Sequence, residues 1–158
     1  MSAADDGERA AQDLLSRTAV GVFRLNGQFL GISEELAGPA GLTAAWWQVL
    51  GAVLREPLPV AGIARAMGIT RQSVQRVADL LVRRGLAEYA PNPAHRRAKL
   101  LRPTDEGRAA VAKIEPGHAD LAARLRDALG AAEFERTVLT LERLSDAVAS
   151  LEQAVTQP

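Results

Sequence analysis

Most of the chain carries apolar residues at the spacing of amphipathic helices. Between residues 9 and 37 these positions fall three or four apart, and the Gly-Pro-Ala-Gly run at 38–41 ends the segment. A second stripe begins after Thr43, whose hydroxyl suits a helix N-cap, and extends to Arg55. Its apolar members follow the i, i+3, i+4, i+7 pattern: Trp46, Val49, Leu50 and Val53. The pattern therefore predicts two helices, each with one face to bury.

Two further helices are predicted in quick succession after Pro57. The first runs from Val60 to Met67, and Gly68 follows at once, a residue that readily adopts the positive φ of a tight turn. The second begins after Thr70 and extends to Arg84, with its apolar positions again at helical spacing: Val74, Val77, Ala78 and Leu81. A short helix, a glycine turn and a longer helix in this order predict a helix-turn-helix.

The periodicity then shortens to that of strands. Residues 86–90 and 98–102 are two short strand candidates, separated by turn-forming residues that lead into Arg96 and Arg97. This arrangement predicts a hairpin with a basic tip. Mainly α-helical structure with a small β-hairpin wing is the fold class that the pattern favours.

The helical pattern returns after Pro103. Thr104 followed by two acidic residues is a typical helix start, because a cap and negative charge both suit a helix N-terminus. We expect a kink at Pro116 and a break at Gly130. The last helix has apolar residues alternately three and four apart, as in a seam against a partner helix: Leu141, Leu144, Val148, Leu151 and Val155.

Charge is distributed unevenly along a chain whose formal net charge is zero. Residues 59–103 carry a net charge of +7, whereas residues 1–58 carry −3 and residues 104–158 carry −4. A basic insert between acidic flanks is typical of a nucleic-acid-binding module held by a structural frame. A solvated charged face is the alternative that charge alone leaves open.

Two sets of side chains could contact DNA. The outer face of the second helix of the helix-turn-helix carries Arg71, Gln72, Gln75 and Arg76, and Arg can pair with guanine and Gln with adenine in the major groove. Arg96 and Arg97 on the hairpin could follow a minor groove, where negative potential is high. Asp79 and Glu88 are expected to be surface or ion-pair residues.

Catalysis and metal binding have little support in the sequence. The chain has no cysteine, and its two histidines, His95 and His118, are far apart without a surrounding carboxylate cluster. No nucleophile elbow or phosphate-binding glycine loop occurs. We therefore expect a protein that is not an enzyme and that has no metal and no cofactor.

The longest uncharged stretch, residues 36–54, is interrupted by glycine and proline at 38–41 and is expected to be a buried helix rather than a membrane span. The first eight residues lack a signal-peptide pattern. Cytoplasmic localisation is the expectation.

The central region resembles the MarR family of bacterial transcription regulators. The resemblance lies in VAGIARAMGITRQSVQR at 60–76, RGL at 84–86, and NPAHRRAKLLRPTDEG at 92–107. It implies a homodimer that binds an inverted repeat through a winged helix-turn-helix below a helical dimerisation layer. It further implies a repressor that a small, often aromatic, molecule releases from double-stranded DNA.

By position, this resemblance assigns residues to roles. The recognition helix would use Thr70, Arg71, Gln72, Ser73, Gln75 and Arg76, and the wing would use His95, Arg96, Arg97 and Lys99. One departure stands out: His95 occupies a place where the family commonly has an acidic residue. A carboxylate there could orient an arginine, so its loss predicts a looser or pH-sensitive wing.

The expected organisation has three parts. Residues 1–42 form an N-terminal helix that contributes to dimerisation, residues 43–103 the DNA-binding domain, and residues 104–158 a helical dimerisation region. The candidate dimerisation residues are Leu14, Leu121, Leu125, Leu141, Leu144, Val148 and Leu151. Phe23, Trp46 and Trp47 could wall a ligand pocket, although core packing is the more usual role of large aromatic residues. The rival hypothesis is a winged-helix module for protein interaction or small-molecule binding, without specific DNA binding.

Overall fold

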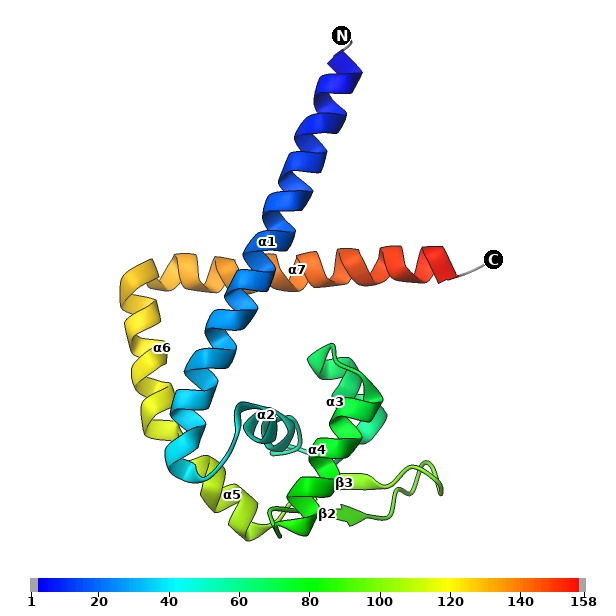
Figure 1. Cartoon of the computed structure of the whole chain (residues 1–158), viewed down its shortest axis with the longest axis vertical. Coiled ribbons are helices and arrows are strands. Elements are labelled where there is room, and N and C mark those ends of the chain that lie inside the picture. Colours follow the sequence, from blue (N-terminus) through cyan, green and yellow to red (C-terminus); the bar gives the residue numbers. More distant parts are fainter. Residues whose placement is uncertain (1–2, 157–158) are drawn as a thin grey trace. The chain divides into compact units, whose positions relative to one another are not determined.

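The computed structural model describes residues 3–156, and its contacts divide the chain into two units, residues 1–114 and 115–158. Figure 1 labels the helices and the strands β2 and β3. The first unit contains α1 (Ala3–Ala37), the 3₁₀ turn η1 (Gly38–Ala40), α2 (Ala44–Ala52), β1 (Leu58–Pro59), α3 (Val60–Met67), α4 (Arg71–Arg83), β2 (Ala87–Ala90), β3 (Leu100–Pro103) and α5 (Asp105–Ala112). The second contains α6 (Glu115–Leu129) and α7 (Ala131–Thr156).

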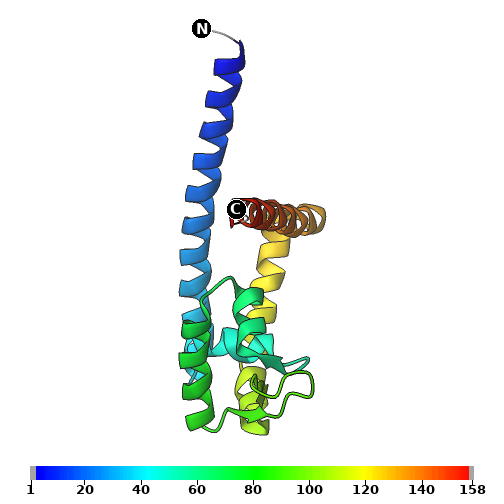
Figure 2. The ribbon, with the colours of Figure 1, turned by 90° about the vertical axis from the view of Figure 1, so that its right-hand side faces the viewer.

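The core of the first unit lies where α2, α3, α4, α5 and the sheet meet. The apolar stripes predicted for α2 and α4 supply much of it, which confirms that these faces are buried. The largest fully buried side chains are Leu50, Ile63, Leu81, Leu101, Ile114, Val49, Val53 and Val74. Helix α1 contributes Ala37 from its last turn, and Figure 2 shows the rest of this helix extending beyond the other elements of its unit.

The sheet has three strands where the sequence predicted two. Strands β2 and β3 form the expected antiparallel hairpin, and β1 pairs with the other edge of β3. Strand β1 escaped prediction because it has only two residues, one of them Pro59. Proline is tolerated on an edge strand because it need not donate a ladder hydrogen bond there.

Several helix boundaries also differ from the sequence-based expectation, and α1 begins at Ala3 rather than at residue 9. Helix α2 ends at Ala52 rather than at Arg55, because the amide of Val53 turns tightly onto the carbonyl of Leu50 at 3.1 Å. The chain breaks between α5 and α6 before Pro116, which lies in the first turn of α6 instead of kinking a continuous helix. A first turn accommodates proline well, since its amide would have no intrahelical acceptor there. The predicted end of α6 at Gly130 is confirmed, with φ of 82°.

Within residues 3–156, no helix combines the length and the apolar character needed to cross a bilayer.

A close junction joins the end of α4 to the start of α5. Gly85 adopts a φ of 71°, and the amide of Leu86 donates to the carbonyl of Leu81 at 2.9 Å, which closes α4. The Leu86 carbonyl then accepts from the amide of Thr104 at 3.1 Å. Helix α5 approaches so closely that a Cβ on Gly107 would overlap the Leu86 carbonyl oxygen. The RGL run at 84–86 and the TDEG run at 104–107 therefore contact each other directly in the fold.

This junction predicts that Gly107→Ala destabilises the protein. The added methyl group meets backbone rather than a movable side chain, so the free energy of unfolding should fall by about 1–3 kcal/mol. Chemical denaturation monitored by circular dichroism measures the change. Gly51→Ala is the matched control, because nothing lies near a Cβ at this position in α2; it should be neutral or stabilise by up to about 1 kcal/mol. Equal effects of the two substitutions would contradict the prediction.

Candidate nucleic-acid interface

The turn between α3 and α4 is fixed by local hydrogen bonds. Gly68 ends α3 with a φ of 63°, and the amide of Ile69 donates to the carbonyl of Ala64 at 3.1 Å. The Thr70 hydroxyl accepts from the Ser73 amide at 3.1 Å and donates to the Ser73 hydroxyl at 2.9 Å. Thr70 and Ser73 were predicted to contact DNA; in the structure the Thr70 hydroxyl caps α4, and the Ser73 hydroxyl accepts a hydrogen bond from it.

Helix α4 is divided between an apolar and a polar face. Val74, Ala78 and Leu81 are fully buried, and Val77 is half-buried against the core. The opposite face exposes the four long polar side chains that the sequence placed there: Arg71, Gln72, Gln75 and Arg76. Among the described residues, no hydrogen bond or ion pair engages the guanidinium groups of Arg71 and Arg76. These cations are therefore available to phosphates or base edges.

The hairpin after α4 forms the predicted wing. Glu88 lies opposite Arg102 in the register of β2 and β3, and their side chains form an ion pair at 2.7 Å. The expectation that Glu88 is an ion-pair residue is thus confirmed. At the tip, the amide of His95 donates to the carbonyl of Asn92 at 3.2 Å, and the carbonyl of His95 accepts from Ala98 at 3.2 Å. His95 therefore shapes the tip through its backbone, and the side chains of residues 95–99 are exposed.

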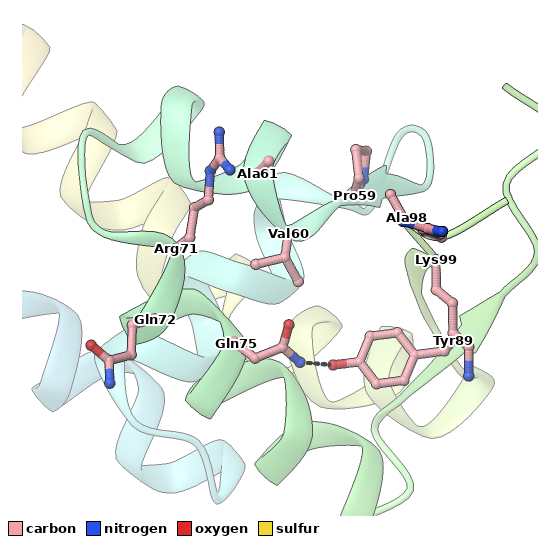
Figure 3. Close-up of a pocket in the computed structure, with 10 residues that line it drawn as sticks. Pro59, Val60, Ala61, Arg71, Gln72, Gln75, Tyr89, Ala98 and Lys99 are labelled. Carbon is pink, nitrogen blue, oxygen red and sulfur yellow. Dashed lines mark hydrogen bonds between the residues drawn. The ribbon is translucent and has the colours of Figure 1, made fainter. Parts of the chain in front are cut away.

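A cleft of about 620 Å³ lies between the start of α3, the polar face of α4 and the base of the wing. Figure 3 shows Arg71 and Gln75 reaching it from the helix, and Lys99 from the wing side. Its lining residues are Pro59, Val60, Ala61, Arg71, Gln72, Gln75, Tyr89, Arg97, Ala98 and Lys99. The structure thus brings residues predicted from two separate segments, helix and wing, onto one concave surface that carries three cations.

A hydrogen-bonded network connects the helix to the wing across this cleft. The Gln75 amide nitrogen donates to Tyr89 Oη at 2.8 Å and to Asp79 Oδ1 at 2.9 Å, and Tyr89 Oη donates to the same Asp79 oxygen at 2.7 Å. Lys99 Nζ lies 6.0 Å from the centroid of the Tyr89 ring. The sequence analysis missed Tyr89 altogether and expected Asp79 to be a surface or ion-pair residue. The helical spacing of Gln75 and Asp79 was visible, but the strand register that brings Tyr89 beside them was not.

Burial and the neighbouring Asp79 raise the pKa of Tyr89 from 10.0 to about 12, against a smaller opposing effect of the hydrogen bond from Gln75. Burial penalises the phenolate, and Asp79 both accepts the phenolic proton and repels the negative charge. The network therefore keeps the phenol protonated in the folded protein.

An alkaline titration checks this effect directly, because Tyr89 is the single tyrosine of the chain. Its phenolate absorbance should develop with a pKa near 12, and Asp79→Asn should move that value toward 10.0. A raised folded-state pKa stabilises the fold fully below pH 10.0, and this contribution is lost as the pH rises through about 12. The network would be refuted if Tyr89 titrated with an ordinary tyrosine pKa while circular dichroism showed that the protein was still folded.

The candidate aromatic pocket residues have different environments. Trp46 and Trp47 are half-buried against the core, which supports a packing role for both, and the Arg84 guanidinium lies 5.3 Å from the centroid of the Trp46 ring. Phe23 on α1 is 74% exposed and is not among the residues packed against the core.

The candidate dimerisation residues are mostly exposed apolar side chains. Leu14 is 60% exposed on α1, and α7 exposes Leu141, Val148 and Leu151 to between 43% and 67%. Leu121, Leu125 and Leu144 are half-buried within the second unit. No group of three or more His, Asp or Glu side chains in the described part of the chain could hold a metal ion.

Comparisons with known proteins place this geometry in a family. The MarR family model matches residues 40–98, which include the helix-turn-helix and much of the wing. An uncharacterised protein of Mycobacterium tuberculosis is 39% identical over 132 residues, a match that covers 84% of this chain and 92% of the relative.

Two solved structures extend the likeness to proteins of known activity. The transcriptional repressor CouR, bound to a 23-mer DNA duplex, is 27% identical with a TM-score of 0.69, and the match covers 79% of this chain and 89% of CouR. BpsR of Bordetella bronchiseptica, whose DNA binding is regulated by 6-hydroxynicotinic acid, is 26% identical with a TM-score of 0.69. That match covers 82% of this chain and 98% of BpsR. The predicted family and the winged-helix fold are thereby confirmed, and the chain belongs to the MarR family of transcription regulators.

Proposed function

We propose that the protein is a sequence-specific transcriptional repressor that binds an inverted-repeat operator as a homodimer in the cytoplasm and is released by a small aromatic molecule. The observation that carries the proposal is the cleft between α4 and the wing. Arg71, Arg97 and Lys99 line it, and Gln72 and Gln75 offer hydrogen-bonding groups beside them. Cations bind phosphates without reading sequence, whereas Gln and Arg side chains can read base edges.

The exposed parts of α4 and of the wing suit DNA binding. Helix α4 presents its N-terminal turns on the exposed side, which is the part of a recognition helix that contacts bases in the major groove. The wing tip carries Arg96 and Arg97 on an exposed turn, where they could reach the minor groove or its phosphates. The DNA-bound CouR structure, at 27% identity, supports this assignment.

The exposed apolar side chains of α1 and α7 support a homodimer. Eight large hydrophobic residues of α1 are between 39% and 74% exposed in the single chain, and α7 adds five more. Isolated exposed leucines are common, but extended rows of them indicate a surface that another chain covers. A second copy also accounts for an inverted repeat, because two-fold protein symmetry matches two-fold operator symmetry.

The proposal of release by a small molecule is supported by two similar proteins and by three aromatic residues of this chain. BpsR responds to 6-hydroxynicotinic acid, and CouR of Rhodococcus jostii has been crystallised with p-coumaroyl-CoA. Trp46 and Trp47 at the start of α2, with Phe23 of α1, are the candidate contacts here. A ligand could shift the DNA affinity only as far as it prefers one spacing of the two DNA-binding lobes over another.

The rival function is a winged-helix interaction module that binds no specific DNA. An interaction surface of that kind usually exposes apolar and aromatic residues at its centre. The polar face of α4 instead carries two arginines and two glutamines, and the region from residue 59 to 103 has a net charge of +7. These features favour nucleic acid as the partner.

Selection of binding sites from random DNA, followed by fluorescence anisotropy at two salt concentrations, tests the proposal. The protein should enrich an inverted repeat with half-sites about one helical turn apart, and sedimentation should give two chains per duplex. With about six to ten phosphate contacts per dimer, affinity should fall by roughly three to five decades between 50 and 200 mM salt. Failure to enrich any sequence would favour the interaction module.

Arg76→Ala should weaken operator binding by about 1–3 kcal/mol if the guanidinium reads a base, and the loss should be largest against one base pair. Arg124→Ala is the matched control, because it also removes one exposed arginine, but from α6 in the second unit and outside the basic segment 59–103. Unchanged affinity of the Arg76 variant would remove this residue from the interface.

A further inference from the structure

The carboxamide of Gln75 is held in one orientation, which distinguishes it from the other polar side chains on α4. Its partner Asp79 is an acceptor when ionised, so the group 2.9 Å from Asp79 Oδ1 must be the amide nitrogen and not the amide oxygen. Tyr89 gives its proton to the same carboxylate oxygen at 2.7 Å, so its lone pairs face the Gln75 nitrogen at 2.8 Å. The chemistry of the two partners thus fixes which end of the carboxamide faces inward.

The geometry of the network also shows which polar atoms of Gln75 remain for DNA. The Gln75 nitrogen, Tyr89 Oη and Asp79 Oδ1 form a nearly equilateral triangle, with sides of 2.8, 2.7 and 2.9 Å. The two hydrogens of a trigonal nitrogen diverge too widely to point at both acceptors of such a triangle. One N–H is therefore shared between Tyr89 and Asp79, and the second N–H stays available together with Oε1.

The two partners are well placed to hold this orientation. Tyr89 lies in β2 opposite Leu101, a fully buried residue of β3, and its own side chain is half-buried. Asp79 is half-buried one helical turn beyond Gln75 on α4. The pKa of Tyr89 is raised to about 12, so the phenol keeps the proton it donates at any physiological pH. Figure 3 shows the Gln75 carboxamide turned toward the Tyr89 hydroxyl, with Gln72 directed elsewhere.

We propose that Tyr89 and Asp79 are positioning residues for sequence specificity, which orient Gln75 so that its free N–H and Oε1 face an adenine in the operator. Adenine presents an N7 acceptor and an N6 donor side by side in the major groove, and a carboxamide pairs with both at once. Orientation before binding reduces the rotamer entropy that the glutamine loses in the complex. This inference rests on the proposed sequence-specific DNA binding.

A specificity profile of the full-length protein tests the inference. Each base pair of the selected operator is replaced in turn, and affinities are measured for wild-type, Tyr89→Phe and Gln75→Ala. The base pair at which Gln75→Ala loses discrimination identifies its contact. Tyr89→Phe keeps the ring beside Lys99 but removes the hydroxyl, so it should lower the preference for A·T at that position by roughly two- to tenfold, the range for one hydrogen bond. Preferences elsewhere and affinity for random DNA should stay unchanged.

Two further variants separate positioning from a merely structural role. Asp79→Ala removes a negative charge near the DNA and should tighten binding to all sequences, yet it should lose discrimination at the same position. Gln72→Ala is the matched control, since no hydrogen bond within the described residues holds Gln72, and its effect should be independent of Tyr89. In the Gln75→Ala background, Tyr89→Phe should have no additional effect.

The inference is overturned if Tyr89→Phe keeps the wild-type profile, if it weakens all DNA sequences equally, or if its effect persists without Gln75. A wild-type protein that shows no sequence preference would overturn the proposed function, and this inference with it. If the wild-type protein prefers a sequence and the Tyr89→Phe variant keeps the same specificity profile, only this inference is overturned and the proposed function stands. The unfolding midpoints of all variants show whether each compared protein is folded.

Discussion

The approach of α5 to the Leu86 carbonyl is the constraint on which the arrangement of the helix-turn-helix and wing depends. That oxygen follows the glycine that ends α4, accepts a hydrogen bond from Thr104 after the sheet, and leaves no room for a side chain on Gly107. The end of α4, the base of the wing and the start of α5 are thereby fixed to one another. Because the hairpin begins and ends at this junction, the wing has a defined position relative to the polar face of α4.

The polar face of α4 and the wing together carry two kinds of side chain. Arg71, Arg76 and Arg97 are exposed cations that suit phosphates and accessible base edges, and they lose side-chain entropy only when they bind. Gln75 is different, because Tyr89 and Asp79 already hold its carboxamide. A surface with exposed cations around an oriented hydrogen-bonding group would combine strong general attraction to DNA with discrimination at a defined position.

The exposed apolar rows on α1 and α7 have a different physical meaning from the buried stripes of α2 and α4. The buried stripes are satisfied within the chain, which is why Val74 and Leu81 are fully buried. Leu14 and Leu151 are 60% and 67% exposed, so their burial requires another surface. The same helical periodicity thus serves folding in one part of the chain and, under the proposal of a homodimer, association in another.

The sequence by itself determined most of the local structure, because caps, glycine turns and apolar spacing act over a few residues. Thr43, Thr70 and Thr104 cap helices as expected, Gly68 and Gly130 end them, and the polar face of α4 points outward. Helix α2 was predicted too long, the kink expected at Pro116 is a break before it, and β1 was missed, since these features depend on contacts rather than on pattern. Tertiary structure alone decided that Tyr89 meets Gln75 and Asp79, because strand register carries no local signal.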